Sequence, residues 1–580
     1  MMLRGVRPDK HTLPRVLTAS RLCFNLAFGK QVHAHAFKLG LSSDLYIITA
    51  LMEMYGRLDS VDVAKWVLDN APSTNSVAWT ILSKLYLMDN KPHLAIEIFN
   101  QMLPLKADID PVGLATAIGA FSHLKSLKQA KKLHQIAKEC GLESHILVGN
   151  SLLKMYVGCD SIEEAQSVFE AMPSKDVISW TQMIHGHVKK GGYNEGLKLF
   201  RRMISAGIKP DCFTISSILP SCGRISAHKQ GKEIHAYLLR NGIDMNLTVQ
   251  NAVMDMYVKS GFIELASNMF MCMMEKDIVS WTIMMYGYSL HGQGGRGLDL
   301  FFEMEKDSSL GTDEFTYTAL LHACVTACRV DVGTHYFNCI RAPTVTHCAL
   351  MVALLARAGL FNEAHKFMEE HQIKNDAEVL RALLDGCRIH QQVKIGKQVV
   401  EQLCELEPLN ADNYVLLSNL YADCAKWDMV DNLKATIRDM GLKSKRAYSW
   451  IEFQNKVHVF GTGDVSHPRS EMIYWELQRL LKKMEDEGHG RPSSVFSLHD
   501  VDEERECSPI GHSEMLAISF GLISTQGRET IRVTKNSRIC RGCHDTAKAI
   551  TKIVGREIII KDPNCFHHFR DGFCSCGDLW

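Results

Sequence analysis

The chain repeats itself with a period of 101 residues, and this period limits the folds that it can adopt. A Trp-Thr step recurs at this spacing, beginning at Trp79, Trp180 and Trp281. A Met-Tyr step and a histidine recur at the same spacing, as Met54-Tyr55, Met155-Tyr156 and Met256-Tyr257, and as His33, His134 and His235. Such a fixed period is typical of arrays of small units that stack on one another.

Each block of the repeat divides into units of about 35, 31 and 35 residues, each with the apolar spacing of two amphipathic helices. A single helical hairpin cannot bury its own apolar side, so neighbouring hairpins supply the core and leave one surface open for an extended partner. The sequence therefore predicts a mostly helical α-solenoid. We interpret the repeated histidines and Met-Tyr steps as packing residues between neighbouring hairpins.

Composition narrows the function less than the period does. Lys plus Arg and Asp plus Glu both total 65, so bulk charge gives no support for nucleic-acid binding, which must depend on local contacts. Nineteen cysteines without a recognisable secretory signal indicate free thiols and metal ligands rather than a disulfide scaffold. The apolar stretches fall short of the about 18 residues that span a membrane, so no membrane partner is expected.

A different pattern begins at about Arg446. Apolar and polar residues alternate in SWIEFQNKVHVFGTGD, which predicts strands, and KKMEDEGHGRPSS is predicted to be a loop. His512 and Glu514 follow in GHSEM, and Cys540 and Cys543 in ICRGCH. One histidine and a Cys-x-x-Cys pair suit a zinc ion with an open position for water, although Cys-x-x-Cys also serves structural zinc and redox sites. In zinc deaminases, a glutamate two residues after the histidine transfers protons and does not bind the metal.

The alternation of longer and shorter units resembles the plant pentatricopeptide repeat proteins of the long-short-pure (PLS) class. The segment from Trp450 is similar to the DYW deaminase domain, through GDVSHP, SLHDVDEE, HSEMLAISFGLI, IVGREIIIKD and FHHFRDGFCSCGDLW. The resemblance implies a repeat array in residues 1–375, helical extension motifs in 376–445 and an α/β zinc deaminase domain in 446–580. The protein-binding tetratricopeptide repeat has a uniform period of about 34 residues and fits less well.

The same resemblance implies that two side chains of each repeat read one base: the fifth residue of the first helix and the last residue of the repeat. The pairs are Thr49 with Asn75, Thr80 with Asp110, Asn150 with Asp176, Thr181 with Asp211, Asn251 with Asp277, and Thr282 with Asp313. With the family's pairing code they predict the target A-G-n-U-G-n-U-G. The alternative is that individual Asp or Asn residues only cap helices.

The resemblance also implies two zinc ions. Glu514 is the expected catalytic residue, beside a catalytic zinc bound by His512, Cys540 and Cys543. A second, structural zinc is expected from His544, one of two adjacent histidines and two cysteines, namely His567, His568, Cys574 and Cys576. The alternative is that the adjacent histidines are exposed or contact RNA.

The predicted function is C-to-U RNA editing, in which a specific cytidine of an organellar transcript is deaminated by zinc-dependent hydrolysis. Two alternatives are a catalytically silent RNA-binding protein that recruits another editing enzyme, and an RNA endonuclease. Leu579 replaces the tyrosine of the family's terminal motif, and this departure keeps the recruiter alternative open, although it touches no proposed catalytic ligand.

The expected partners are single-stranded organellar RNA and other organellar editing factors, and no DNA is expected. Members of the family act in chloroplasts or mitochondria. The first residues, MMLRGVRPDKHTL, do not have the composition of a transit peptide and resemble the end of a repeat, so we expect the targeting segment to be absent from this chain.

Overall fold

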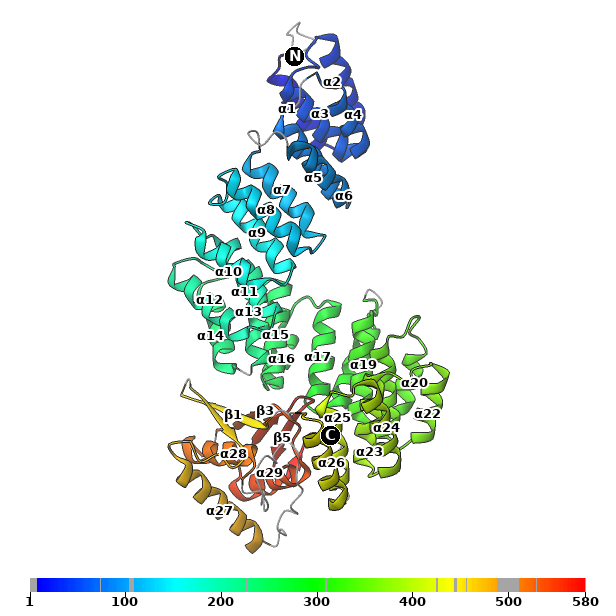
Figure 1. Cartoon of the computed structure of the whole chain (residues 1–580), viewed down its shortest axis with the longest axis vertical. Helices are drawn as coiled ribbons and strands as arrows, with labels where there is room; N and C mark the ends of the chain where they lie inside the picture. Colours follow the sequence, from blue (N-terminus) through cyan, green and yellow to red (C-terminus); the bar gives the residue numbers. More distant parts are fainter. Residues whose placement is uncertain are drawn as a thin grey trace. The chain divides into compact units, whose positions relative to one another are not determined.

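The computed structural model divides the chain into two compact units, Met1–Ser221 and Cys222–Trp580 (Figure 1). It describes residues 8–72, 75–103, 109–225, 227–307, 310–423, 426–442, 446–454, 456–487, 511–527 and 529–578. Among the helices of these ranges, none is both long and apolar enough to cross a membrane.

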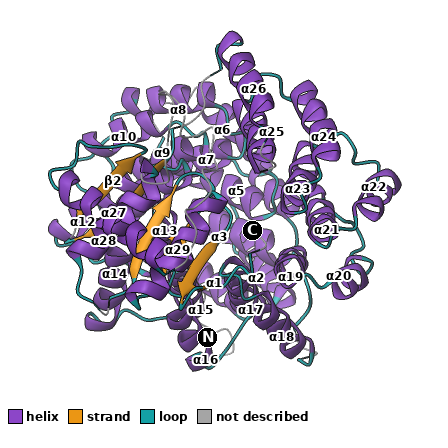
Figure 2. Cartoon of the chain, turned by 90° about the horizontal axis from the view of Figure 1, so that it is seen from below, coloured by secondary structure: helices purple, strands orange, loops and turns teal. Residues whose placement is uncertain are grey.

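Helical hairpins account for the chain up to residue 439, and helices dominate Figure 2. The earlier helices are α1 (Thr12–Leu22), α2 (Leu26–Lys38), α3 (Leu45–Leu58), α4 (Val61–Asp69), α5 (Ser76–Met88), α6 (Pro92–Met102), α7 (Pro111–Ser122), α8 (Leu127–Glu139), α9 (Ile146–Gly158), α10 (Ile162–Ala171), α11 (Val177–Lys189), α12 (Tyr193–Ser205) and α13 (Cys212–Arg224). The later ones are α14 (His228–Arg240), α15 (Leu247–Lys259), α16 (Ile263–Cys272), α17 (Ile278–Leu290), α18 (Gly294–Glu305), α19 (Glu314–Ala327), α20 (Val330–Phe337), α21 (Val345–Arg357), α22 (Phe361–Glu370), α23 (Ala377–Ile389), α24 (Val393–Leu406), α25 (Ala411–Asp423) and α26 (Trp427–Asp439).

The helices keep the period of the sequence. Helices α3, α9 and α15 begin at Leu45, Ile146 and Leu247, which are 101 residues apart. Within each unit, the first helix of a hairpin packs against the first helix of the next, as α3 does against α5 and α17 against α19. This stacking buries the apolar stripe of each helix and confirms the predicted solenoid.

The repeated histidines and tyrosines form the same contact at three places along the array. The Nδ1 atoms of His33, His134 and His235 lie 2.9, 3.0 and 2.9 Å from the hydroxyls of Tyr55, Tyr156 and Tyr257. Each histidine is in the second helix of one hairpin and each tyrosine in the first helix of the next. The interpretation of these residues as packing residues between hairpins is therefore confirmed.

The C-terminal region forms a six-stranded mixed sheet in the order β2-β1-β3-β4-β5-β6. Its strands are β1 (Tyr448–Phe453), β2 (Lys456–Gly461), β3 (Ile531–Lys535), β4 (Ile558–Lys561), β5 (Phe566–Arg570) and β6 (Phe573–Cys574). Strands β3 and β4 are parallel, joined by helix α29 (Arg541–Val554), and the other neighbours are antiparallel. Strands β1 and β2 confirm the alternation that the sequence predicts from Ser449 onward.

Two further helices complete this region, α27 (Ser470–Asp486) and α28 (Ser513–Ser524). Helix α28 packs against β1, β2 and β3, and α27 packs against α28 and α29. The prediction of a loop from Lys482 was wrong for residues 482–486, because Leu480 and Met484 continue the buried face of α27 into this charged stretch.

Candidate functional site

The first candidate metal site lies at the N-termini of two helices of the C-terminal region. His512 is the residue before α28, and Cys540 is the residue before α29, where its Sγ accepts a hydrogen bond from the backbone of Cys543 at 3.4 Å. The partial positive charge of a helix N-terminus favours thiolates, so this placement suits cysteines that bind a metal. The His-x-Glu motif precedes β3 and the Cys-x-x-Cys motif follows it, and the fold places the two motifs side by side.

These residues form a compact group of possible metal ligands. Single side-chain atoms of His512, Glu514, Cys540 and Cys543 all lie within 4.8 Å of one another. His512 Nδ1 lies 3.6 Å from Cys540 Sγ and 3.2 Å from Cys543 Sγ, so Nδ1 is the nitrogen that faces the thiols. Hydrogen bonds from Cys543 and His512 lower the pKa of Cys540 to about 5, which favours its thiolate.

Glu514 in the same group is fully buried and forms an ion pair with a lysine. Lys535 Nζ, also buried, donates to Glu514 Oε2 at 2.6 Å. Burial alone would raise the pKa of Glu514, but the charges of Lys535 and His512 outweigh it and lower the pKa to about 2. The other oxygen, Oε1, is buried and has no hydrogen-bond partner among the described residues. Glu514 is therefore held as an anion with one free acceptor oxygen.

Lys535 was missed by reasoning from sequence, although a signal for it was present. In β3 the residues alternate between buried and partly exposed, and Ile531, Val533 and Lys535 share the buried phase. A lysine at an inward position of a strand needs a buried anionic partner. The alternation of this short strand could therefore have marked Lys535 as a residue of the site.

The second candidate metal site consists of His544, His567, Cys574 and Cys576, whose ligand atoms also lie within 4.8 Å of one another. His544 Nε2 lies 3.3 Å from Cys576 Sγ, and His567 Nδ1 lies 3.7 Å from Cys574 Sγ. The two cysteine sulfurs are 3.2 Å apart, and both cysteines are free thiols. This arrangement supplies two nitrogen and two sulfur ligands, as a closed structural zinc site requires.

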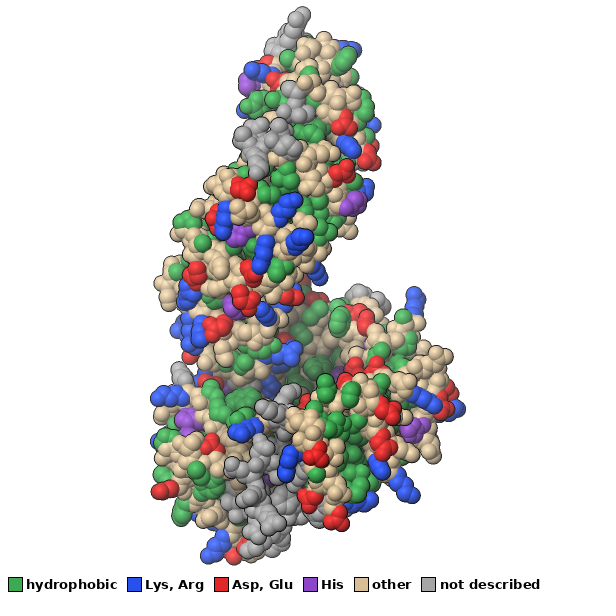
Figure 3. All heavy atoms as spheres, in the orientation of Figure 1, with side chains coloured by type: hydrophobic (Ala, Val, Ile, Leu, Met, Phe, Trp, Pro, Cys, Tyr) green, Lys and Arg blue, Asp and Glu red, His purple; other side chains and the backbone are tan. Residues whose placement is uncertain are grey.

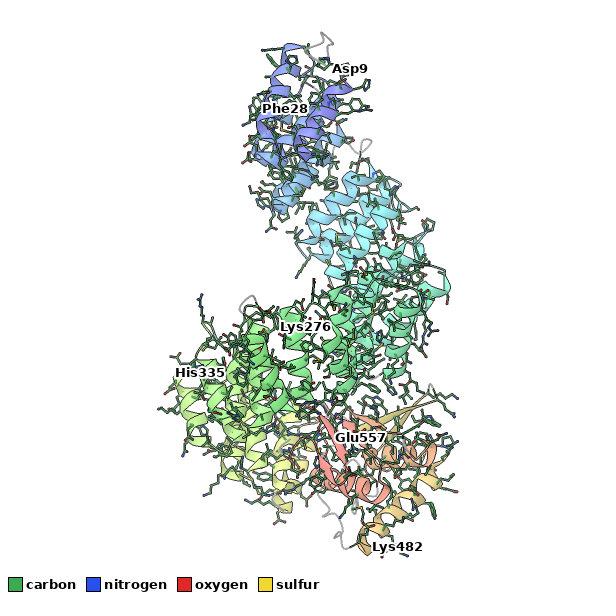
Figure 4. The ribbon with its side chains drawn as sticks, turned by 180° about the vertical axis from the view of Figure 1, so that it is seen from behind. Asp9, Phe28, Lys276, His335, Lys482 and Glu557 are labelled. Atoms are coloured by element: carbon green, nitrogen blue, oxygen red, sulfur yellow. The ribbon has the colours of Figure 1, made fainter. Side chains whose placement is uncertain are left out.

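Of the two adjacent histidines, the structure places His567 in this cluster and turns His568 away. His567 Nε2 lies 3.3 Å from the buried carboxylate of Asp562, a contact that orients the ring and leaves Nδ1 toward the cysteines. His568 Nε2 lies 2.7 Å from Nδ1 of His291, and its Nδ1 lies 3.9 Å from Glu557, which Figure 4 labels. Alternation along β5 explains the difference, because successive side chains of a strand point to opposite faces.

In the repeats, all six second residues of the proposed reading pairs cap the following helix. Each accepts a hydrogen bond from the backbone N–H three residues later, at 2.7 to 3.0 Å, in Asn75, Asp110, Asp176, Asp211, Asp277 and Asp313. The structure thus shows that all six residues cap helices. Capping does not occupy the whole side chain, because in four of the aspartates the hydrogen bonds from the described residues all go to Oδ1, namely Asp110, Asp211, Asp277 and Asp313.

The first residues of the pairs lie beneath these caps. Asn150, Asn251, Thr80 and Thr181 are buried, and Thr49 and Thr282 are half-buried. Asn150 and Asn251 donate from Nδ2 to their paired aspartates at 3.1 and 3.0 Å. The two residues of each asparagine pair are therefore in direct contact, as joint reading of one base requires.

Exposed apolar side chains flank five of the six pairs, and reasoning from sequence did not single them out. Each lies three residues before the first residue of its pair and is at least 40% exposed: Tyr46, Val77, Leu147, Ile178 and Val279. The sequence did contain a sign of them: an apolar residue that recurs with the repeat at a position outside the apolar face of its amphipathic helix.

Charges on the surface are mixed. Figure 3 shows Lys and Arg side chains interspersed with Asp and Glu over the face in view, as the balanced composition predicts. Lys276, labelled in Figure 4, precedes the cap Asp277, and its Nζ donates to the carbonyl oxygen of Met273 at 2.8 Å. Some features singled out in the sequence lie outside the described residues, namely residues 488–510 and the terminal Leu579.

Family models match most parts of the chain. The model of the DYW family of nucleic acid deaminases matches residues 488–580, and the E motif model matches 390–452. Models of the PPR repeat family and the PPR repeat match residues 175–224, 77–103, 150–177, 251–278 and 279–309.

Curated relatives come from Arabidopsis thaliana. A putative pentatricopeptide repeat-containing protein is 34% identical over 622 residues, covering 100% of this chain and 87% of the relative. A relative named as mitochondrial is 36% identical over 587 residues, covering 100% and 93%, and one named as chloroplastic is 36% identical over 582 residues, covering 99% and 67%. The solved structure of the pentatricopeptide repeat protein PPR10 in complex with an 18-nt psaJ RNA element covers 76% of this chain and 70% of its own, with a TM-score of 0.55 and 15% identity. That likeness supports the solenoid fold.

Proposed function

Because this chain belongs to the pentatricopeptide repeat proteins, with an E motif and a DYW deaminase domain, we propose that it is an RNA-editing factor that converts one cytidine to uridine. Residues 1–375 are proposed to bind single-stranded RNA, 376–445 to form the extension motifs and 446–580 to carry the reaction. The observation that carries this proposal is the buried group of His512, Glu514, Cys540 and Cys543, in which the glutamate is an anion beside three metal ligands.

The residues of the first site fit a catalytic zinc ion. They offer one imidazole nitrogen and two thiols, one of them with a lowered pKa. Three ligands would leave the fourth position of a tetrahedral zinc ion for water. A zinc ion held by His512, Cys540 and Cys543 supplies the Lewis acidity that activates water at neutral pH. A redox Cys-x-x-Cys site would not require the buried histidine and glutamate beside it.

Glu514 is proposed to move the protons of the reaction. Its free Oε1 accepts a proton from water as the water oxygen bonds to the ring carbon that carries the amino group of cytidine. The same carboxyl group then returns this proton to the ring nitrogen of the base and carries the proton of the new hydroxyl group to the amino group, which leaves as ammonia as the carbonyl of uridine forms. Lys535 holds Oε2, so Glu514 keeps a fixed orientation through both transfers.

The second cluster is proposed to hold a structural zinc ion through His544, His567, Cys574 and Cys576. Cys543 and His544 are neighbours in sequence, so a metal bound at His544 would also fix the start of α29, where Cys540 and Cys543 lie. A closed zinc site of this kind stabilises a small domain directly.

The repeats are proposed to read the target A-G-n-U-G-n-U-G through the six polar pairs. Each pair combines a capping side chain with a buried or half-buried hydroxyl or amide, and these polar groups suit hydrogen bonds to the edge of a base. The apolar residues beside them, such as Ile178 and Val279, suit contact with the flat faces of unstacked bases. Following the relatives named as chloroplastic or mitochondrial, the proposed location is one of these organelles, and other editing factors there are proposed partners.

Sequencing of RNA co-expressed with the full chain in bacteria tests this function. The RNA library places cytidines at varied distances downstream of A-G-n-U-G-n-U-G. Conversion to uridine that requires both the motif and Glu514 supports an autonomous editing enzyme. Binding of the motif without conversion would leave a recruiter, and cleaved RNA would indicate an endonuclease.

A further inference from the structure

A third polar side chain joins the proposed reading pair at four of the six sites. It is the third residue of the helix that the second member of the pair caps. These residues are Ser179, Thr214, Ser280 and Thr316, and all four are fully buried. No base could reach such a residue directly, yet each one bonds to both members of its pair.

At the Thr181 site, this third residue fixes the direction of the hydrogen bonds. Thr214 Oγ1 lies 2.7 Å from Asp211 Oδ1 and 2.6 Å from Thr181 Oγ1. An ionised carboxylate only accepts, so the hydroxyl of Thr214 donates to Asp211 and its oxygen accepts from Thr181. The proton of Thr181 is thereby turned inward, and only its lone pairs face outward. At the Thr282 site, Thr316 Oγ1 donates to Asp313 at 2.7 Å and lies 3.3 Å from Thr282 Oγ1, but the hydroxyl of Thr282 donates to the carbonyl oxygen of Ile278 at 2.7 Å.

At the asparagine sites, the third residue fixes the orientation of the amide. Asn251 Nδ2 donates to Asp277 at 3.0 Å, and the one proton of Ser280 Oγ is shared between two acceptors, Asn251 Oδ1 at 2.7 Å and Asp277 Oδ1 at 2.8 Å. Asn150 makes the same pair of bonds with Asp176 and Ser179. A flipped amide would place its oxygen against the carboxylate, so the order of donor and acceptor is set by chemistry.

Two sites lack the third hydroxyl. Gly113 takes its place at the Thr80 site, and Ala78 takes it at the Thr49 site. The consequence is visible at Thr80, whose Oγ1 is buried without a hydrogen-bond partner among the described residues. The hydroxyl of Thr80 can therefore turn either way, to donate or to accept.

We propose that Ser179, Thr214 and Ser280 are specificity-determining positioning residues, which set the hydrogen-bond polarity that each of their sites presents to a base. This inference rests on the proposed reading of RNA by the pairs. A threonine that only accepts favours guanine, whose pairing edge carries two donors, over adenine, whose ring nitrogen is an acceptor. A fixed amide separates uracil from cytosine, because their donor and acceptor orders are reversed. The Thr80 site should accept either purine, in contrast to the guanine that the pairing code predicts.

The test is a binding assay of the full chain with synthetic A-G-n-U-G-n-U-G RNA and its single-base variants. For the wild-type chain, guanine-to-adenine exchange opposite Thr181 should weaken binding about tenfold, and the same exchange opposite Thr80 less than about twofold. Thr214→Val removes the hydroxyl at nearly constant shape and should reduce the tenfold ratio to about twofold. Thr214→Ser restores the hydroxyl and should restore the ratio, which a loss of packing would not explain.

Ser280→Ala gives the matching test at the Asn251 site, read as the ratio of affinities for uracil and cytosine, with Ser280→Thr as the rescue. If Thr214→Val or Ser280→Ala discriminates between the bases as strongly as the wild-type chain does, this inference is overturned, while the proposed reading of RNA by the pairs still stands. Guanine discrimination at Thr80 as strong as at Thr181 would also overturn it. If the wild-type chain prefers none of these RNAs over a shuffled one, the proposed reading sites fail, and this inference fails with them.

Discussion

The repeat array and the C-terminal sheet region use polar side chains in opposite ways. The array distributes small polar groups over its helix ends. Each group depends on contacts with residues nearby in the sequence, as Asn251 does on Asp277. The sheet region gathers polar groups in two buried clusters, one assembled from β3, α28 and α29 and the other from α29, β5 and the segment of β6. We therefore expect the loss of one polar residue to weaken RNA binding by a limited amount in the array, but to abolish the role of a whole cluster in the sheet region.

The largest expected effect is at Glu514. Glu514→Gln keeps the size of the side chain but removes the proton acceptor, so conversion of cytidine should fall by about a thousandfold or more. Sequencing of co-expressed RNA measures conversion, and RNA affinity should not change. The exposed Glu529→Gln serves as the control and should edit normally. Editing by the Glu514 variant at the wild-type rate would remove the glutamate from the mechanism.

The next effect concerns the second cluster. Cys576→Ser should lower the bound zinc by one equivalent and unfold the sheet region at a lower temperature, because a closed metal site contributes directly to folding. Metal analysis and thermal unfolding followed by near-UV circular dichroism measure the two changes.

His567→Ala and His568→Ala separate the adjacent histidines. The first variant should lose the same equivalent of zinc, and the second should retain it, since His568 contacts His291. Loss of zinc in the His568 variant alone would contradict the assignment of the cluster.

A smaller effect is expected in the array. Asp277→Ala removes both a helix cap and a proposed reading group, so it should cost about 1 kcal/mol of stability and weaken RNA binding several-fold. Asp44→Ala is the matched control, because Asp44 caps α3 and is not a proposed reading residue. The two variants should lose similar stability, as measured by urea unfolding. Equal loss of RNA affinity in both would show that Asp277 acts through folding alone.

The smallest expected effect is a dependence of array stability on acid. At Asp176 and Asp277, burial opposes ionisation, but hydrogen bonds from Ser179, Ser280 and the paired asparagines outweigh it and lower the pKa of both carboxyl groups below 3.8. Their contribution to stability is complete above this ordinary value and is lost as the pH falls through the lowered one. Urea unfolding of wild type and Asp277→Asn at pH 6 and pH 3 should show a smaller loss in the variant. An equal loss in both would exclude Asp277 from this acid effect.

Much of the array was predictable because its determinants are local. The recurrence of His33 and Tyr55 every 101 residues predicted stacked hairpins, and the caps lie where short polar residues precede apolar runs. Less was predictable in the C-terminal region. The sequence predicts a loop for the charged residues 482–486, but they belong to α27. Met484 lies on the buried face of this helix, which packs against α28 and α29.

The sequence by itself determined which residues could bind a metal, because His-x-Glu and Cys-x-x-Cys carry their chemistry in their spacing. It also determined the period of the solenoid, since the apolar stripe of each helix is written in consecutive residues. Only the tertiary structure decided between His567 and His568, and only it paired Lys535 with Glu514. Both outcomes depend on which face of a strand meets a helix, and that is settled by packing between segments far apart in the chain.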